Sequence, residues 1–218
     1  MICFRSVSKR YPVKGGSNLV LDSIDLVINR GEKVGIIGRN GAGKSTTIRL
    51  LSGAELPTSG EIDRLMSVSW PLAFGGAFQS ALTGRDNLRL ICRLYGQEIN
   101  ESLAFVQEFA ELGRYFDEPV KTYSSGMRAR LAFAISMVIE FDCFLIDEVV
   151  AVGDSRFHEK CHTELFEKRS DRCFIIVSHD TAYIKAHCDN VYVLKSGKLH
   201  RFEHPQQAID FHNHGEYL

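Results

Sequence analysis

The sequence lacks an excess of charge of either sign. Its 218 residues include 26 Lys and Arg against 27 Asp and Glu, which gives a formal net charge of −1 at pH 7. Proteins that bind nucleic acid generally are usually strongly basic, so this composition argues against such a binder. The hydrophobic share of 44% also excludes a disordered chain. We predict a soluble globular protein with one large domain, or a domain with a subdomain.

The six cysteines include no C-x-x-C pair, the spacing typical of redox and zinc sites. Residues 1–5 also lack the basic and then apolar layout of a signal peptide. We therefore expect reduced thiols in a cytosolic protein.

A transmembrane segment is also missing from the sequence. The run from Leu65 to Gly84 carries no charge over 20 positions, which is long enough to cross a bilayer as a helix. Its centre, however, contains Pro71, Gly75 and Gly76, and its apolar content is low. We expect no membrane span of the chain's own.

The apolar pattern instead predicts strands and helices in alternation. Strand-like alternation opens the chain at Ile2, Phe4 and Val7 and again from Ile24 to Ile28. Capping residues favour one helix from Thr83 to Gly96 and a second from Asn100 to Gly113. We predict further strands at 33–37, near 62, and at 143–146, 173–177 and 191–194, and helices at about 44–53, 127–140, 155–169 and 181–188 and from 205.

This order predicts the fold class. Strands alternating with helices favour a mainly parallel α/β sheet, and we expect an antiparallel β part at the N-terminus. The helical block at about 82–140 interrupts that order. We therefore predict one domain, residues 1–218, with an α-helical subdomain inserted at about 82–140.

A Gly-rich loop between a predicted strand and helix fits G-x-x-x-x-G-K-[ST] in full at residues 38–45. Glycines let the backbone N–H groups wrap a polyphosphate, and the N-terminus of the following helix attracts the same anion. Lys44 would hold the β- and γ-phosphates, and Ser45 would place its hydroxyl on Mg²⁺. The predicted phosphate-binding residues are Gly38, Arg39, Asn40, Gly41, Ala42, Gly43, Lys44, Ser45 and Thr46.

An apolar strand that ends in two carboxylates predicts the other half of this site. Asp147 would lie at the carboxyl edge of the sheet, beside the phosphate loop, and would hold Mg²⁺. Glu148 would act as the general base on a water molecule. Together the two motifs predict a nucleoside triphosphatase whose sheet is a P-loop NTPase (RecA-like) core. The absence of an Asn-Lys-x-Asp motif disfavours a GTPase.

Five further features resemble those of ABC ATPases, and they follow one another along the chain in the order that is typical of this family. The segment Tyr123-Ser124-Ser125-Gly126-Met127-Arg128 resembles the family signature, Leu-Ser-Gly-Gly-Gln, although it departs from it at three positions. Gln79, Asp154 and His179 match the family's Q-loop, D-loop and switch histidine. Tyr11 matches the aromatic residue that stacks on adenine.

The resemblance implies a role for each residue and a head-to-tail homodimer that binds ATP and Mg²⁺. Ser124, Ser125 and Gly126 would contact the nucleotide of the partner copy, and Asp154 would lie at that interface. Gln79 would bind Mg²⁺, and His179 would contact the γ-phosphate. Met127 lacks the amide of the usual glutamine, so one contact across the interface would be missing.

Each of these residues also has an ordinary structural interpretation, which the sequence leaves open. Tyr11 could cover the sheet, and Gln79 and His179 could be polar surface residues. Asp154 could cap the next helix. We expect Arg128 and Arg130 to form a solvated helix face.

The run 148–161, with 38–40 and 82–87, is similar to the ATPases of bacterial surface-polysaccharide exporters. The group serves capsule, O-antigen and teichoic acid. Because little of the chain follows residue 205, we expect it to lack the extra carbohydrate-binding domain of some O-antigen members, and it is most like the capsular form. The resemblance implies a polytopic permease that handles the polysaccharide, at the cytoplasmic face of the inner membrane. An importer ATPase, or a soluble ABC ATPase acting on DNA or ribosomes, stays an alternative.

Overall fold

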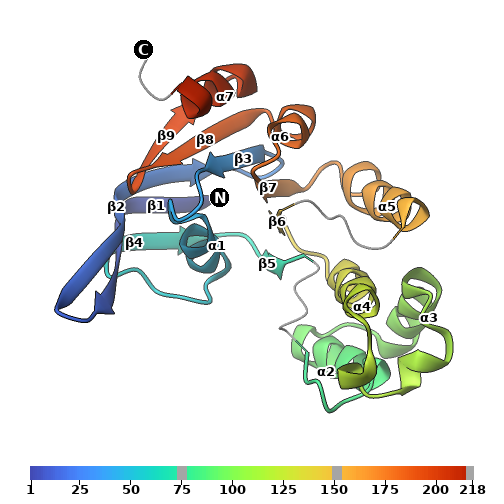
Figure 1. Cartoon of the computed structure of the whole chain (residues 1–218). Helices are drawn as coiled ribbons and strands as arrows, with labels where there is room; N and C mark the ends of the chain where they lie inside the picture. Colours follow the sequence, from blue (N-terminus) through green and yellow to red (C-terminus); the bar gives the residue numbers. More distant parts are fainter. Residues whose placement is uncertain (73–77, 149–153, 215–218) are drawn as a thin grey trace. The chain divides into compact units, whose positions relative to one another are not determined.

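The computed structural model describes residues 1–72, 78–148 and 154–214. By its contacts the chain divides into two compact units (Figure 1). The sheet unit comprises residues 1–71, 141–149 and 171–218, and the helical unit comprises 72–140 and 150–170.

A three-stranded antiparallel sheet in the order β2-β1-β4 opens the sheet unit. Its strands are β1 (Ile2–Val13), β2 (Gly16–Ile28) and β4 (Ser59–Arg64). Phe4 pairs with Leu26, and the alternating apolar residues of both strands are buried. Every second residue of each strand therefore points to the same face of the hairpin, and this face is buried in the core, as the sequence predicted.

The six-stranded sheet has the order β5-β6-β7-β3-β8-β9. Neighbours are parallel from β5 to β8, and β9 is antiparallel to β8. The strands are β3 (Lys33–Gly38), β5 (Val68–Pro71), β6 (Cys143–Asp147), β7 (Cys173–Val177), β8 (Asn190–Lys195) and β9 (Lys198–Phe202). The predicted fold, a mainly parallel α/β sheet with an antiparallel N-terminal part, is confirmed. The strands β5 and β9 were not predicted.

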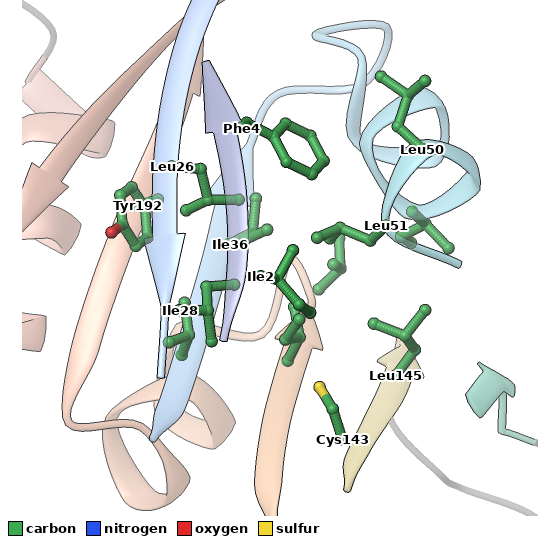
Figure 2. Packing of buried hydrophobic residues seen from close by; sticks show 14 of the residues in the cluster. Ile2, Phe4, Leu26, Ile28, Ile36, Leu50, Leu51, Cys143, Leu145 and Tyr192 are labelled. Atoms are coloured by element: carbon green, nitrogen blue, oxygen red, sulfur yellow. The ribbon is translucent and has the colours of Figure 1, made fainter. Parts of the chain in front are cut away.

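Three helices accompany this sheet: α1 (Lys44–Ser52), α6 (Thr181–His187) and α7 (Pro205–His214). Figure 2 shows Ile2 and Phe4 of β1 in one cluster with Ile36 of β3 and Leu51 of α1. Full burial of a side chain of this size contributes about 1.5–3 kcal/mol. The core thus fixes β3 and α1, the two elements that hold the phosphate loop.

The helical unit contains α2 (Gly84–Tyr95), α3 (Ile99–Ala110), α4 (Ser125–Val138) and α5 (Ser155–His162). Two 3₁₀ turns, Gly113–Asp117 and Val120–Thr122, lie between α3 and α4, and a π turn, Thr163–Glu167, follows α5. Aromatic rings join three of the helices, since Phe109 lies 5.6 Å from Phe133 and 5.4 Å from Phe157 between ring centroids. The description of residues 1–218 as one domain with an inserted subdomain stays a prediction.

The ends of α2 agree with the sequence, whereas the ends of α3 do not. Thr83 caps α2 by accepting a hydrogen bond from the Asp86 N–H, and Gly96 ends it. The prediction that Asn100 caps α3 and Gly113 closes it was wrong. Glu98 is the N-cap and Glu111, with φ of 53°, is the C-cap. None of the helices in the described ranges is long and apolar enough to cross a membrane.

Candidate nucleotide site

The phosphate loop joins the buried end of β3 to the first turn of α1. Gly43 is the N-cap, so the helix begins without a side chain that could occupy its first N–H groups. The first turn also contains no acidic residue. Both features leave the positive end of the helix available to an anion.

Two glycines of the loop are required by its geometry. Gly43 has φ of 112°, and a Cβ there would lie 3.0 Å from Val20 Cγ1. A Cβ at Gly38 would lie 2.7 Å from the carbonyl oxygen of Leu194. Any side chain at either position would therefore displace the loop from β2 or β8.

The loop borders an open cavity of about 540 Å³. The cavity is lined by Val20, Asn40, Gly41, Gly43, Lys44, Ser45, Thr46, Asp147 and Glu148. The Lys44 ammonium donates to the carbonyl oxygens of Gly38, at 2.7 Å, and Arg39, at 3.4 Å. The loop thus holds the Lys44 ammonium beside a space in which a polyphosphate could bind.

Arg39 and Ala42 line a neighbouring cavity of about 540 Å³ instead, with Lys195 and His212. Burial, followed by the positive charges of Lys44 and Arg39, lowers the pKa of His212. Asn40 and Gly41 line both cavities. Eight of the nine predicted phosphate-binding residues therefore line one cavity or both, and Gly38 lines neither.

The acidic pair lies where the sequence placed it, at the end of β6. Glu148 has φ of 62°, and its N–H donates to the carbonyl oxygen of Val177 at 2.7 Å. Its carboxylate lies 2.5 Å from Nδ1 of His179. The predicted general base and the predicted switch histidine are therefore in direct side-chain contact.

Oxygen ligands for Mg²⁺ lie on the same cavity. Burial, followed by the charge of Glu148, raises the pKa of Asp147, and Lys44 acts in the opposite direction. A divalent cation at this edge would stabilise the ionised form of Asp147, and carboxylate and hydroxyl oxygens are the ligands that Mg²⁺ prefers. Asp147 and Ser45 therefore fit Mg²⁺.

Tyr11 lies beside the first turn of α1, with its hydroxyl bound to charged side chains. The hydroxyl donates to Glu55 at 2.7 Å and accepts from Arg49 at 2.9 Å. It also lies 3.4 Å from Oγ1 of Thr46, a residue of the cavity wall. Glu55 and Arg49 were not part of the predicted site.

Gln79 belongs to the helical unit, where Asn87 holds its backbone. The Asn87 side chain accepts from the Gln79 N–H at 2.9 Å and donates to the Gln79 carbonyl at 3.2 Å. The buried Asn87 is a positioning residue that the sequence did not reveal. The signal that could have indicated it is its place on the apolar face of the predicted helix, four residues before Ile91.

The signature segment begins α4 in the same unit. Ser124 is the N-cap, and its hydroxyl accepts from the Met127 N–H at 3.2 Å. Ser125 and Gly126 form the first turn. The local fold thus places all three residues at the positive end of a 14-residue helix.

Asp154 caps α5 by accepting from the Phe157 N–H at 2.9 Å. The Arg130 guanidinium lies 3.2 Å from the Asp154 carboxylate, 3.3 Å from that of Glu111 and 4.5 Å from the ring centre of Phe157. The Arg130 side chain is only 19% exposed. The prediction that Arg130 lies on a solvated face was therefore wrong.

The run 149–153, part of the subgroup resemblance, lies outside the described residues. Gln79, Ser124, Ser125, Gly126 and Asp154 lie in the helical unit, and the other predicted site residues lie in the sheet unit.

A strand, a Gly-rich loop, a helix and an adjacent acidic strand end define a nucleotide-binding cassette of the P-loop class. A comparison with family profiles matches residues 21–151 to the family described as ABC transporter. The chain belongs to the ABC transporter family, as its motifs predicted.

Two curated relatives are similar over nearly the whole chain. The capsule polysaccharide export ATP-binding protein CtrD of Neisseria meningitidis serogroup B is 59% identical, over 98% of this chain and 99% of its own length. The ATP-binding protein BexA of Haemophilus influenzae is also 59% identical, over 98% of each chain. The predicted resemblance to the capsular polysaccharide group is confirmed.

A solved structure shows the same fold. It is a dimeric structure of the ATP-binding cassette MJ0796 in a post-hydrolysis state, bound to ADP and Pi. The TM-score is 0.78 at 21% sequence identity, over 93% of this chain and 98% of the other.

Proposed function

We propose that this chain is the ATP-hydrolysing subunit that powers export of a lipid-linked capsular polysaccharide across the bacterial inner membrane. The observation that supports this best is a single cavity lined by Lys44, Ser45, Asp147 and Glu148. This cavity lies in a chain that is 59% identical to CtrD over nearly its full length.

The loop binds the triphosphate of ATP. Backbone N–H groups at the start of α1 face the phosphates, and Lys44 turns from the Gly38 carbonyl toward the β- and γ-oxygens. Mg²⁺, when bound, neutralises charge on those oxygens. Ser45 and Asp147 would hold it, with Gln79 as a further ligand.

Hydrolysis begins when Glu148 accepts a proton from the attacking water. His179, 2.5 Å from that carboxylate, fixes its direction and contacts the γ-phosphate. The water oxygen bonds to the γ-phosphorus as the bond to the β–γ bridging oxygen breaks. The products are ADP and inorganic phosphate.

A second copy of the chain completes the site. A Cβ at Gly126 would lie 4.0 Å from the Ser124 hydroxyl oxygen, an ordinary van der Waals distance, so packing within this copy does not require glycine there. Close approach of a phosphate bound to the partner copy would require it. In the proposed dimer two copies face head to tail, with Ser124, Ser125 and Gly126 of one at the ATP of the other and Asp154 at their interface.

Closing and opening of this dimer drives a separate polytopic permease, which handles the polysaccharide. The chain binds the permease at the cytoplasmic face of the inner membrane, through the loop around Gln79 and the helices at 82–112. Cysteines placed at residues 85–100 should crosslink to the permease. Crosslinks from other surfaces alone would place the docking surface elsewhere.

The test of the exporter function replaces Glu148 by Gln in the bacterium that encodes this chain. Capsular polymer should be made but should accumulate inside the cell, leaving the surface bare. Glu203→Gln, the same change at an exposed carboxylate after β9, is the matched control and should leave the capsule intact.

Other outcomes would support other functions. Retention of O-antigen or teichoic acid in place of capsule would assign the chain to that exporter. A normal surface coat with loss of uptake of a nutrient would replace the exporter by an importer.

A further inference from the structure

The Tyr11 hydroxyl lies in a charged network next to the phosphate cavity. It donates to Glu55 Oε2 at 2.7 Å and accepts from Arg49 Nη2 at 2.9 Å. Arg49 lies on α1 and Glu55 on the loop that follows it. A residue of β1 is thus held by its tip to the helix that begins at the phosphate loop.

Glu55 is fixed from several sides. Arg49 Nε lies 3.0 Å from its Oε2, and Lys9 Nζ lies 2.9 Å from its Oε1. The bond from Tyr11, followed by those from Lys9 and Arg49, lowers the pKa of Glu55 to about 2. The carboxylate therefore stays ionised at neutral pH and accepts three hydrogen bonds at once.

The network also orients the Tyr11 ring. Its hydroxyl lies 3.4 Å from Thr46 Oγ1, and Thr46 lines the cavity. The Lys9 ammonium lies 5.2 Å from the ring centre and covers one face. A planar ligand can therefore stack only on the opposite face of a ring whose tip is already fixed.

We propose that Glu55 is a positioning residue for the nucleobase, which acts by holding Tyr11 in the orientation that stacks on adenine. This rests on the proposed ATP-binding function and on the predicted stacking of Tyr11. Without Glu55 the Tyr11 hydroxyl would lose its acceptor and keep only the contacts with Arg49 and Thr46. The ring would then be held less firmly, and ordering it would weaken affinity by about two- to tenfold. The phosphates make no use of the ring, so their binding should not change.

The experiment compares two ligands by titration calorimetry at neutral pH: ADP, which carries the base, and inorganic tripolyphosphate, which does not. Glu55→Ala removes the acceptor, and Tyr11→Phe keeps the ring but removes its hydroxyl. Each should weaken ADP binding about two- to tenfold and leave tripolyphosphate binding unchanged. The double variant should bind ADP as tightly as whichever single variant binds it less tightly, because both changes break the same contact.

Two further variants separate positioning from general damage. Glu55→Gln retains an oxygen that can accept from Tyr11 and should bind ADP more tightly than Glu55→Ala does. Glu61→Ala removes an exposed carboxylate of the neighbouring strand β4 and should match the wild type. Thermal unfolding of each variant checks that it is folded, and Tyr11→Phe provides the test if Glu55→Ala is not.

Equal weakening of ADP and tripolyphosphate by Glu55→Ala would overturn the proposal, because Glu55 would then act on the phosphate loop. Unchanged ADP binding in both Glu55→Ala and Tyr11→Phe would also overturn it. A wild-type chain that binds neither ligand would instead refute the proposed ATPase function.

Discussion

Replacing Glu148 by Gln tests the proposed chemistry most directly, because the change removes a charge and keeps the shape. The amide oxygen of Gln can still accept from His179, and the backbone N–H still donates to Val177. The positive φ of residue 148 strains Glu and Gln alike. The variant should therefore fold as the wild type does.

The structure indicates that the effect on rate exceeds the effect on stability. The Glu148 side chain is 46% exposed and that of His179 75% exposed, and exposed ion pairs generally contribute about 0–1 kcal/mol. Loss of a general base slows a reaction about 10²- to 10⁴-fold, which is about 3–5 kcal/mol in activation free energy. A rate loss of that size could not come from unfolding.

Nucleotide binding should survive this change. The charge of Glu148 is one of two causes that raise the pKa of Asp147. Gln removes that cause, so the pKa of Asp147 should fall toward its ordinary value. The affinity for ATP in the presence of Mg²⁺ should be at least that of the wild type.

Phosphate release, calorimetry with ATP and thermal unfolding measure the three quantities separately, with Glu203→Gln as the control. Turnover within threefold of the wild type would show that the base lies elsewhere. Loss of ATP binding in a folded variant would mean that Glu148 binds the nucleotide and does not act chiefly as a base.

Three further changes test other parts of the molecule. Lys44→Ala should weaken ATP binding itself, since its ammonium lies beside the cavity at the Gly38 carbonyl; unchanged affinity by calorimetry would contradict the assignment of the loop. Glu55 has a pKa of about 2, below its ordinary value of 4.5, so its contribution to stability should be present above pH 4.5 and lost as the pH falls toward 2; the difference in melting temperature between the wild type and Glu55→Gln should shrink over that range, and a constant difference would be against it. Arg130→Ala should lower the free energy of unfolding by about 1–2 kcal/mol through loss of its carboxylate and ring contacts, measured by urea unfolding; no change would show that the cluster contributes nothing.

The elements around the phosphate loop could be predicted because their signals are local. The strands β6 and β7 are short apolar runs, wholly buried up to Ile146 and Val177. The glycines at 41 and 43 have positive φ, a backbone conformation that favours glycine, so the residue type at these positions already indicates the turn of the loop. These signals need no knowledge of the rest of the fold.

The strand β5 could not be predicted in this way. It is four residues long and ends in Pro71, which disfavours a strand. It forms because Val68 pairs with Cys143 of β6, and because Trp70 packs edge-on against Phe141 at 5.4 Å between ring centroids. Both partners lie far along the chain, so tertiary contacts outweigh the local preference.

The ends of α3 show a different limit. Asn100 and Glu98 are both possible caps, and propensity favours Asn. In the structure the Ser102 hydroxyl donates to the Glu98 carbonyl at 2.6 Å, and the helix begins at Ile99. A side-chain cap contributes about 0.5–2 kcal/mol, so one local hydrogen bond of about 0.5–1.5 kcal/mol, such as that of Ser102, can move the boundary.

The same reasoning separates the site residues that the sequence revealed from those it did not. Lys44 and Glu148 lie in contiguous motifs, and their chemistry follows from their neighbours in the chain. Arg130 lies on a helix that offers no local partner for its charge, and its acceptors, Glu111 and Asp154, come from two other elements. Its burial therefore depends on packing that no motif encodes. In this chain, tertiary structure determines which residues hold a motif in place. Substitutions of such residues therefore test what the fold contributes to function, separately from the chemistry of the motifs.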